Sequence, residues 1–319
     1  MSIKIRHSLL LFLTAVIWGV AFVAQSTGMK YVGPFTFNGI RNILGGMVLL
    51  PYIWLMTKNN KNKDTKEKKH GNKKLLIIAG ISCGIVFTIA SNLQQIAIES
   101  TEAGKAGFIT AFYIVIVPVL GLFFKKKNPI WVYFSVIIAI VGLFFMCMDF
   151  TIELRGIIPV PAGDFSMGRA EWLLLLSALF FSIHILLIDH FSPLVNGAKL
   201  SCIQFFVCGI ISSLIMFAVE KPVVADILNA KVPILYAGIL SCGVAYTLQI
   251  VGQNGVNPTV ASLIMSLESV VSVLAGWIIL NEHLLPKELM GCALMFISII
   301  IAQIPGKKKL IEPEKENSL

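Results

Sequence analysis

The chain is built from apolar stretches of about twenty residues, and its second half resembles its first. At a shift of 158 residues, identical residues coincide: Ala79, Gly80, Ile81, Gln95, Thr101, Ala103 and Val115 fall on Ala237, Gly238, Ile239, Gln253, Thr259, Ala261 and Val273. Each half contains five of the stretches. Because an odd number of spans reverses the direction of the chain, the two copies are expected to cross a membrane in opposite orientations.

The composition independently indicates a membrane protein. Hydrophobic residues make up 56% of the chain and charged residues only 13%, whereas soluble domains carry about 25% charged residues. The apolar stretches are residues 8–29, 33–56, 75–98, 103–124, 130–149, 170–188, 199–219, 232–252, 258–280 and 285–304. We therefore predict an all-α integral membrane protein with ten transmembrane helices in two inverted five-helix repeats, a layout that alternating-access transporters use.

The loops divide this chain into four parts. Residues 1–150 and 170–305 are predicted to form the first and second repeats, 151–169 an external connector, and 306–319 a cytoplasmic tail. Pro159, Pro161 and Gly163 lie in the connector, and these residue types predict an irregular conformation there.

The distribution of positive charge predicts the orientation. Eighteen Lys and Arg residues lie in the termini and in the loops on the same side, against seven on the other side. By the positive-inside rule, both termini are expected in the cytoplasm, with the chain in the plasma membrane. The net charge of +9 is thereby explained, because most of the cations lie on the cytoplasmic side of the lipid bilayer. The bilayer is the expected partner, and a nucleic acid is not.

Glu268 is the most informative polar residue inside the predicted membrane region. It lies about nine residues into the ninth stretch, near the bilayer midplane at about 1.5 Å per residue. A carboxylate at this depth is costly and usually faces a bundle interior or a watery cavity. It could take up a proton from one side and release it to the other, which coupling to protons requires. A permanent bond to a neighbouring helix is the structural alternative.

Other polar and aromatic residues are candidates for lining a substrate cavity. Tyr246 and Gln249 share one face of the eighth stretch with Gln253, which aligns with Gln95 in the repeat. The aromatic residues would form walls, and Gln249 and Glu268 would fix the orientation of the substrate. Packing between helices is the alternative for each residue. The candidate substrate-binding residues are Trp18, Gln95, Phe112, Tyr113, His184, Tyr246, Gln249 and Glu268.

Two cations also lie within apolar stretches. Arg41 is one third of the way along the second stretch, where it could bind an anion or bond the carbonyls of a neighbouring helix. The structural role is the favoured one. Lys105 lies among small residues near one end of the fourth stretch, and its side chain can extend to the surface. A role in substrate access is therefore the less favoured interpretation of Lys105.

Several motifs resemble those of a known family. The segment Ala15 to Phe22, with Trp18-Gly19, precedes Gly33-Pro34 and Arg41, and this order resembles the start of EamA-type members of the drug/metabolite transporter superfamily. The segments 258–270 and 280–282, followed by Gly291, resemble the second half of that family. One departure is Ser269, which stands where the family usually has a proline after the glutamate.

The resemblance implies a bundle of two inverted repeats around a central cavity, walled by the first, third, fourth, sixth, eighth and ninth helices. It also implies a secondary carrier, with exporters of amino acids, other metabolites or drugs among its relatives. We therefore expect a proton-coupled or facilitative transporter of a small organic metabolite, in the export direction, with protons as a further partner in the coupled case. Neither a cofactor nor a metal is expected, and a homodimer stays open.

Other functional classes receive less support from the residues. No HExxH, GxSxG or paired acidic motif points to an enzyme, so no catalytic residue is assigned. A channel usually shows rings of charge or a carbonyl filter sequence, and neither is visible. A channel or a membrane scaffold without active transport remains the alternative.

Overall fold

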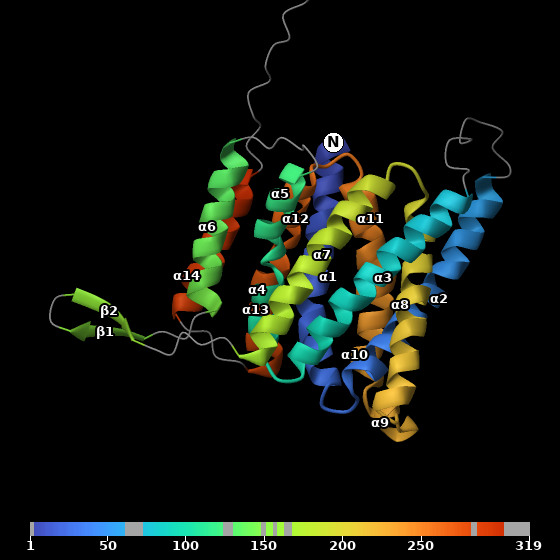
Figure 1. The fold of residues 1–319 in the computed structure, drawn as a ribbon, viewed down its shortest axis with the longest axis horizontal. Helices are drawn as coiled ribbons and strands as arrows, with labels where there is room; N and C mark the ends of the chain where they lie inside the picture. Colours follow the sequence, from blue (N-terminus) through green and yellow to red (C-terminus); the bar gives the residue numbers. More distant parts are fainter. Residues whose placement is uncertain are drawn as a thin grey trace, which may run out of the picture.

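The apolar stretches form helices in the computed structural model, which describes residues 3–60, 73–123, 130–147, 151–155, 158–162, 168–281 and 286–302. The first half contains α1 (Ile3–Gly28), α2 (Pro34–Asn60), α3 (Lys73–Ile98), α4 (Ala103–Thr110), α5 (Tyr113–Phe123) and α6 (Ile130–Cys147) (Figure 1). The second half contains α7 (Arg169–Phe191), α8 (Gly197–Val219), α9 (Val224–Asn229), α10 (Lys231–Leu235), the π-helix η2 (Tyr236–Tyr246), α11 (Thr247–Gln253), α12 (Pro258–Met265), α13 (Leu267–Leu280) and α14 (Pro286–Ala302).

Eight segments of the described chain are helical, long and apolar enough to cross a membrane. They are Ile5–Gly28, Pro34–Lys58, Lys73–Ile98, Ala103–Gly121, Arg169–Phe191, Gly197–Val219, Lys231–Gln253 and Pro258–Leu280. Shorter apolar helices at Ile130–Gly142 and Leu289–Ser298 occupy the fifth and tenth predicted stretches. The prediction of a helical membrane protein built from two five-helix halves is confirmed.

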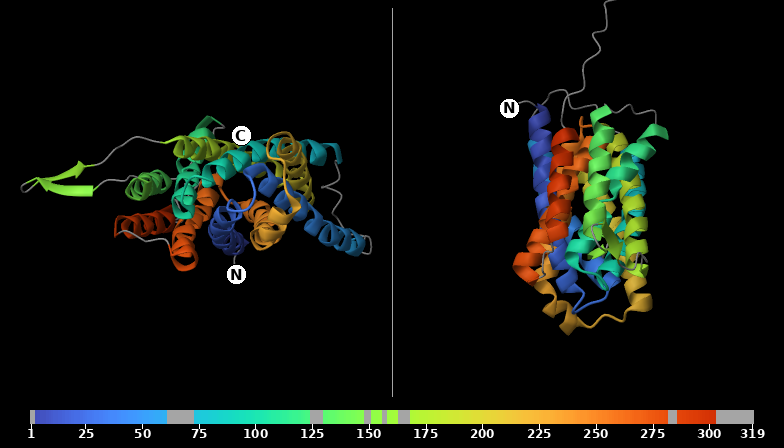
Figure 2. Two further views of the ribbon diagram at one scale, coloured as in Figure 1. Left: turned by 90° about the horizontal axis from the view of Figure 1, so that it is seen from below. Right: turned by 90° about the vertical axis from the view of Figure 1, so that its left-hand side faces the viewer.

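The two halves run in opposite directions through the bundle. α1 begins at the end that holds the N-terminus, and its C-terminal part shares an apolar cluster with the start of α7, through Phe22, Val23 and Leu174. α7 thus starts where α1 ends, as inverted repeats require. The last helices of the two halves, α6 and α14, pack side by side at one edge of the bundle (Figure 1, Figure 2).

Three spans that the sequence predicts as continuous helices are divided. The fourth span separates into α4 and α5 at Ala111 and Phe112, and the ninth into α12 and α13 at Ser266. In the eighth, the 11-residue π-helix η2 lies between α10 and α11. π-helical segments are rare and frequently lie at functional sites.

Four serines account for the division of the ninth span. The hydroxyls of Ser262, Ser266, Ser269 and Ser272 each donate to the carbonyl three residues earlier, at 2.9, 2.8, 2.6 and 2.8 Å. Such bonds offer the backbone carbonyls a competing partner and bend helices. At Ser269 the backbone N–H also bonds the carbonyl of Ser266, at 3.0 Å, three residues back. The helix is therefore interrupted beside Glu268 without a proline at position 269.

The connector between the halves is not irregular throughout, which corrects the prediction for residues 151–169. Strands β1 (Thr151–Arg155) and β2 (Ile158–Ala162) pair antiparallel, with Thr151 opposite Ala162. Pro159 and Pro161 stand at alternate positions of β2. In a two-stranded ribbon, alternate N–H groups point away from the partner strand, so prolines at those positions remove no ladder bond.

A partly buried contact between the halves lies at the end of the bundle opposite the N-terminus. The Glu220 carboxylate, at the end of α8, accepts bonds from the backbone N–H groups of Phe35 and Thr36 at 2.8 and 2.7 Å, and from the Thr36 hydroxyl at 2.7 Å. It thus satisfies N–H groups that the first turn of α2 leaves free. A Cβ built at Gly33 would lie 2.6 Å from the Glu220 Oε1 atom, so the glycine makes room for this cap.

We expect Glu220→Ala to lower the free energy of unfolding by about 2–3 kcal/mol, because it leaves two helix-terminal N–H groups and one hydroxyl without their charged acceptor. Glu220→Gln, which keeps one acceptor oxygen, should cost about half as much. Thermal unfolding of the purified protein in detergent measures both changes. Equal stability of Glu220→Ala and the wild type would show that water replaces the carboxylate without cost.

Candidate functional site

A central cavity lies between the two halves, and the space in it that the centre of a water-sized sphere can reach is about 30 Å³. The first half contributes side chains from α1 to α5: Trp18, Ala21, Phe22, Gln25, Arg41, Gln94, Thr110 and Tyr113. The second half contributes side chains from α7, η2, α11, α12 and α13: Phe181, His184, Ile185, Ser241, Tyr246, Gln249, Met265 and Glu268. The wall thus includes the six spans named in the sequence analysis and also the second, through Arg41.

Six of the eight candidate residues face this cavity. They are Trp18, Tyr113, His184, Tyr246, Gln249 and Glu268. Gln95 and Phe112 are not among the lining residues, although each lies next to one that is. Their neighbours Gln94 and Tyr113 line the cavity instead.

The face of α3 that carries Gln95 turns toward other helices. Ser91, one turn earlier, places its hydroxyl 3.5 Å from the Cys208 thiol of α8. Gln95 is fully buried, and both polar atoms of its amide lack a hydrogen-bond partner among the described residues. Gln94, about 100° further around the helix, donates instead to the Thr110 hydroxyl at 3.2 Å.

Phe112 lies at the junction of α4 and α5. Here the backbone bonds tighten to a three-residue spacing, with the N–H of Phe112 on the carbonyl of Ile109 at 3.1 Å. The side chain packs partly buried against the largest apolar cluster of the protein. The division of the span thus directs Tyr113, and not Phe112, into the cavity.

Glu268 is buried, with 4% of its surface exposed. Its Oε1 atom accepts a bond of 2.9 Å from the Tyr113 hydroxyl, which links the ninth span to the fourth. Because the ninth span is divided at Ser266, Glu268 stands in the first turn of α13, where the helix dipole favours a carboxylate. The site therefore holds an ionisable group inside the membrane region, in the lining of the cavity between the halves.

Aromatic rings form one wall around Tyr246. Its ring centroid lies 4.5 Å from that of Trp18, 4.8 Å from Phe87 and 5.5 Å from Phe205. Tyr246 is the last residue of η2, and Ser241 from the same π-helix also lines the cavity. Of these rings, those of Trp18 and Tyr246 line the cavity, whereas Phe87 and Phe205 are fully buried outside its lining.

His184 joins this wall and has a fixed partner. Its Nε2 atom lies 3.1 Å from the Gln204 Oε1 atom of α8, whereas its Nδ1 atom has no partner among the described residues. Its ring centroid lies 5.4 Å from that of Phe87. The histidine is therefore held in place and presents a polar edge in the cavity lining.

Arg41, Gln25 and Gln94 line the cavity although the sequence does not predict them there. The sequence favours a structural role for Arg41 and gives no prediction for the two glutamines. A signal existed on α1, because Trp18, Ala21 and Gln25 share one helical face at spacings of three and four. This spacing is the one expected when one face of a helix lines a cavity.

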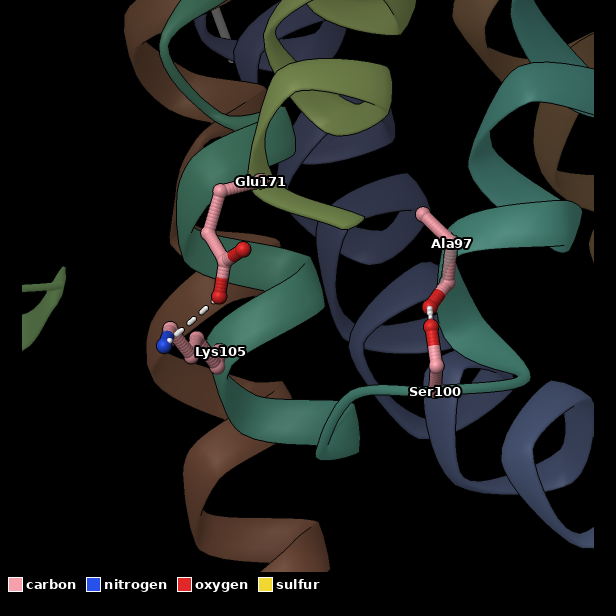
Figure 3. A network of polar contacts seen from close by, with 4 residues as sticks. All are labelled: Ala97, Ser100, Lys105 and Glu171. Carbon is pink, nitrogen blue, oxygen red and sulfur yellow. Dashed lines mark hydrogen bonds and ion pairs between the residues drawn. The ribbon is translucent and has the colours of Figure 1, made fainter. Parts of the chain in front are cut away.

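Lys105 is in an ion pair and does not line the cavity. Its Nζ atom lies 2.8 Å from the Glu171 Oε1 atom, and this pair ties α4 to the start of α7 (Figure 3). Nearby, the Ser100 hydroxyl donates to the carbonyl of Ala97 at 3.4 Å in the turn before α4. The two charged side chains are 27% and 18% exposed, and pairs near the surface contribute at most about 1 kcal/mol.

Comparisons with known proteins agree with this geometry. Residues 6–148 and 168–303 each match the sequence profile of the EamA-like transporter family. A protein of Archaeoglobus fulgidus, described as an uncharacterized transporter, is 28% identical over 295 residues, which cover 92% of this chain and 84% of that protein. A solved crystal structure with 14% sequence identity superposes with a TM-score of 0.68 over 93% of this chain and 97% of the other.

Proposed function

The chain belongs to the EamA-like transporter family, and from this premise we propose that it exports a small organic metabolite across the cytoplasmic membrane by alternating access. The observation that carries the proposal is the cavity between the inverted halves, to which each half contributes eight side chains. A site shared in this way changes its access when one half rocks against the other. Binding and release then occur on opposite sides of the membrane.

The excess of positive charge supports an orientation with both termini in the cytoplasm. Residues 1–150 and 170–305 then act as the two moving repeats, with 151–169 outside and the tail 306–319 inside. In this orientation, the Lys105–Glu171 pair and the Glu220 cap lie near the outer surface.

Within the cavity, the aromatic wall holds the apolar part of the solute, and Gln249 and His184 provide polar contacts. Glu268 couples the movement of the solute to that of a proton. Two observations support this role. Glu268 is buried, and among the described residues its carboxylate accepts a hydrogen bond from the neutral hydroxyl of Tyr113. The absence of a cationic partner within ion-pair distance among the described residues leaves the carboxylate free to change its charge during transport.

Filling the cavity tests the transport proposal. Ala21 lines the cavity, so we expect Ala21→Phe to reduce export at least tenfold by occupying space that the solute needs. The matched control is Leu13→Phe on the same helix, because Leu13 is 47% exposed on the outer face of the bundle. The measurement compares metabolites in the medium of cells that produce the wild type, either variant or no protein, at equal membrane abundance.

A compound released by the wild type and by Leu13→Phe, but not by Ala21→Phe, would identify an exported solute that passes through this cavity. Equal release by both variants would place the path elsewhere. If neither the wild type nor the control differs from cells without the protein, export of metabolites is wrong. Import, or a scaffold role, would then be the better explanation.

A further inference from the structure

Arg41 is a buried cation in the lining of the cavity. The residue is 4% exposed, and its Nη1 group donates a hydrogen bond of 2.9 Å to the Gln25 Oε1 atom. The Nε–H group has no partner among the described residues. The guanidinium also lies 5.6 Å from the centroid of the Phe37 ring, one turn earlier on α2.

A purely structural arginine should have more partners. Buried charges in proteins are normally paired with an opposite charge, because the cost of removing an ion from water is otherwise large. Among the described residues, Arg41 has no carboxylate within 4 Å, since the ion pair found there joins Lys105 to Glu171. No hydrogen bond joins its guanidinium to a carbonyl of the described backbone either, and its partner is a neutral amide that also lines the cavity.

We infer that Arg41 and Gln25 form an anion subsite that binds a carboxylate group of the transported solute, an inference that rests on the proposed function. The planar guanidinium has donors in a fork that matches a carboxylate, and its unpartnered Nε–H supplies one of them. Gln25 accepts from Arg41 through its oxygen, which directs its amide nitrogen elsewhere as a further donor.

The remaining lining of the cavity is compatible with a carboxylate at this end. The Nε1–H of Trp18, seven residues before Gln25 on the same face of α1, is a further buried donor, and no described residue accepts a hydrogen bond from it. The lining also contains an acidic residue, Glu268 on the ninth span, which accepts a hydrogen bond from Tyr113. The two charges are thus held by different partners, and the carboxylate of a solute does not compete with Glu268 for Arg41.

The test uses pairs of probes that differ only in the acid group. Purified protein in detergent is titrated with lactate and lactamide, leucine and leucinamide, and benzoate and benzamide, and binding is read from the shift of the thermal unfolding midpoint. We expect at least one acid to stabilise the wild type, with an affinity at least tenfold higher than that of its amide. The amino acid pair distinguishes a zwitterionic solute from a simple anion.

Two variants of the subsite separate its function from its packing. Gln25→Glu is nearly isosteric and supplies Arg41 with its own carboxylate, so it should keep the fold and lower acid binding at least tenfold. Arg41→Lys keeps the charge but not the fork, and should retain weaker binding. Lys105→Gln removes a cation outside the cavity and should bind acids as the wild type does.

The inference is wrong if the amides bind as tightly as the acids, if no acid shifts the midpoint, or if Gln25→Glu leaves the affinity for the acid intact. These outcomes differ from failure of the proposed function. If Ala21→Phe blocks export of a solute that has no acid group, the transporter proposal stands and the anion subsite does not. If Ala21→Phe and Leu13→Phe export equally, the cavity itself is not the path.

Discussion

Glu268→Gln is expected to reduce transport driven by a proton gradient by about a hundredfold, while exchange of solute for solute continues. The glutamine keeps the shape of the side chain and an oxygen that can accept the bond of 2.9 Å from Tyr113. It cannot take up and release a proton, so the step that links the gradient to the solute is lost. The measurement is solute accumulation in liposomes with and without an imposed pH difference, next to counterflow in its absence.

The matched control is Glu171→Gln, the same chemical change at a carboxylate that pairs with Lys105 outside the cavity. It should transport as the wild type does. Accumulation of solute against its gradient by Glu268→Gln would refute proton coupling through this residue. Loss of exchange together with accumulation would assign Glu268 to solute binding or packing, and Tyr113→Phe, which removes only the donor to the carboxylate, would then show a comparable defect.

The helices could be predicted from the sequence because the membrane imposes a simple rule. A span needs about twenty apolar residues, and charges mark where each span ends. The divisions within the spans follow a different rule. The division of the ninth span depends on the bonds of four serine hydroxyls. Small polar residues in a helix can equally face a neighbouring helix or a cavity. Their effect depends on geometry that spacing alone does not reveal.

The site was partly predictable for a similar reason. Glu268 and His184 stand out because charged or titratable groups are costly in a membrane. Glutamines give a weaker signal, since Gln94 and Gln95 are adjacent on α3 and only the packing of α3 against its neighbours decides which one lines the cavity. The role of Arg41 depends on whether a carboxylate pairs with its guanidinium, and only the folded structure shows which side chains lie near it.

The contact between α1 and α13 connects a sequence motif to the position of Glu268. A Cβ built at Gly19 would lie 2.6 Å from the Val271 Cγ1 atom and 2.7 Å from the backbone oxygen of Glu268 itself. The second distance involves backbone, so a side chain at this position cannot be accommodated by a change of rotamer. The glycine beside Trp18 thus allows α1 to approach the helix that carries the carboxylate, while Trp18 lines the cavity.

We expect Gly19→Val to lower the free energy of unfolding by about 3 kcal/mol or more, because α1 and α13 must move apart to admit two branches of side chain. Thermal unfolding and the fraction of monodisperse protein in detergent measure the loss. Gly121→Val on α5 is the matched control, since a Cβ built there meets nothing within 4 Å. If both variants are equally stable, the approach of α1 to α13 does not depend on the glycine. If Gly19→Val folds but loses only gradient-driven accumulation, the contact serves to position Glu268 more than to stabilise the bundle.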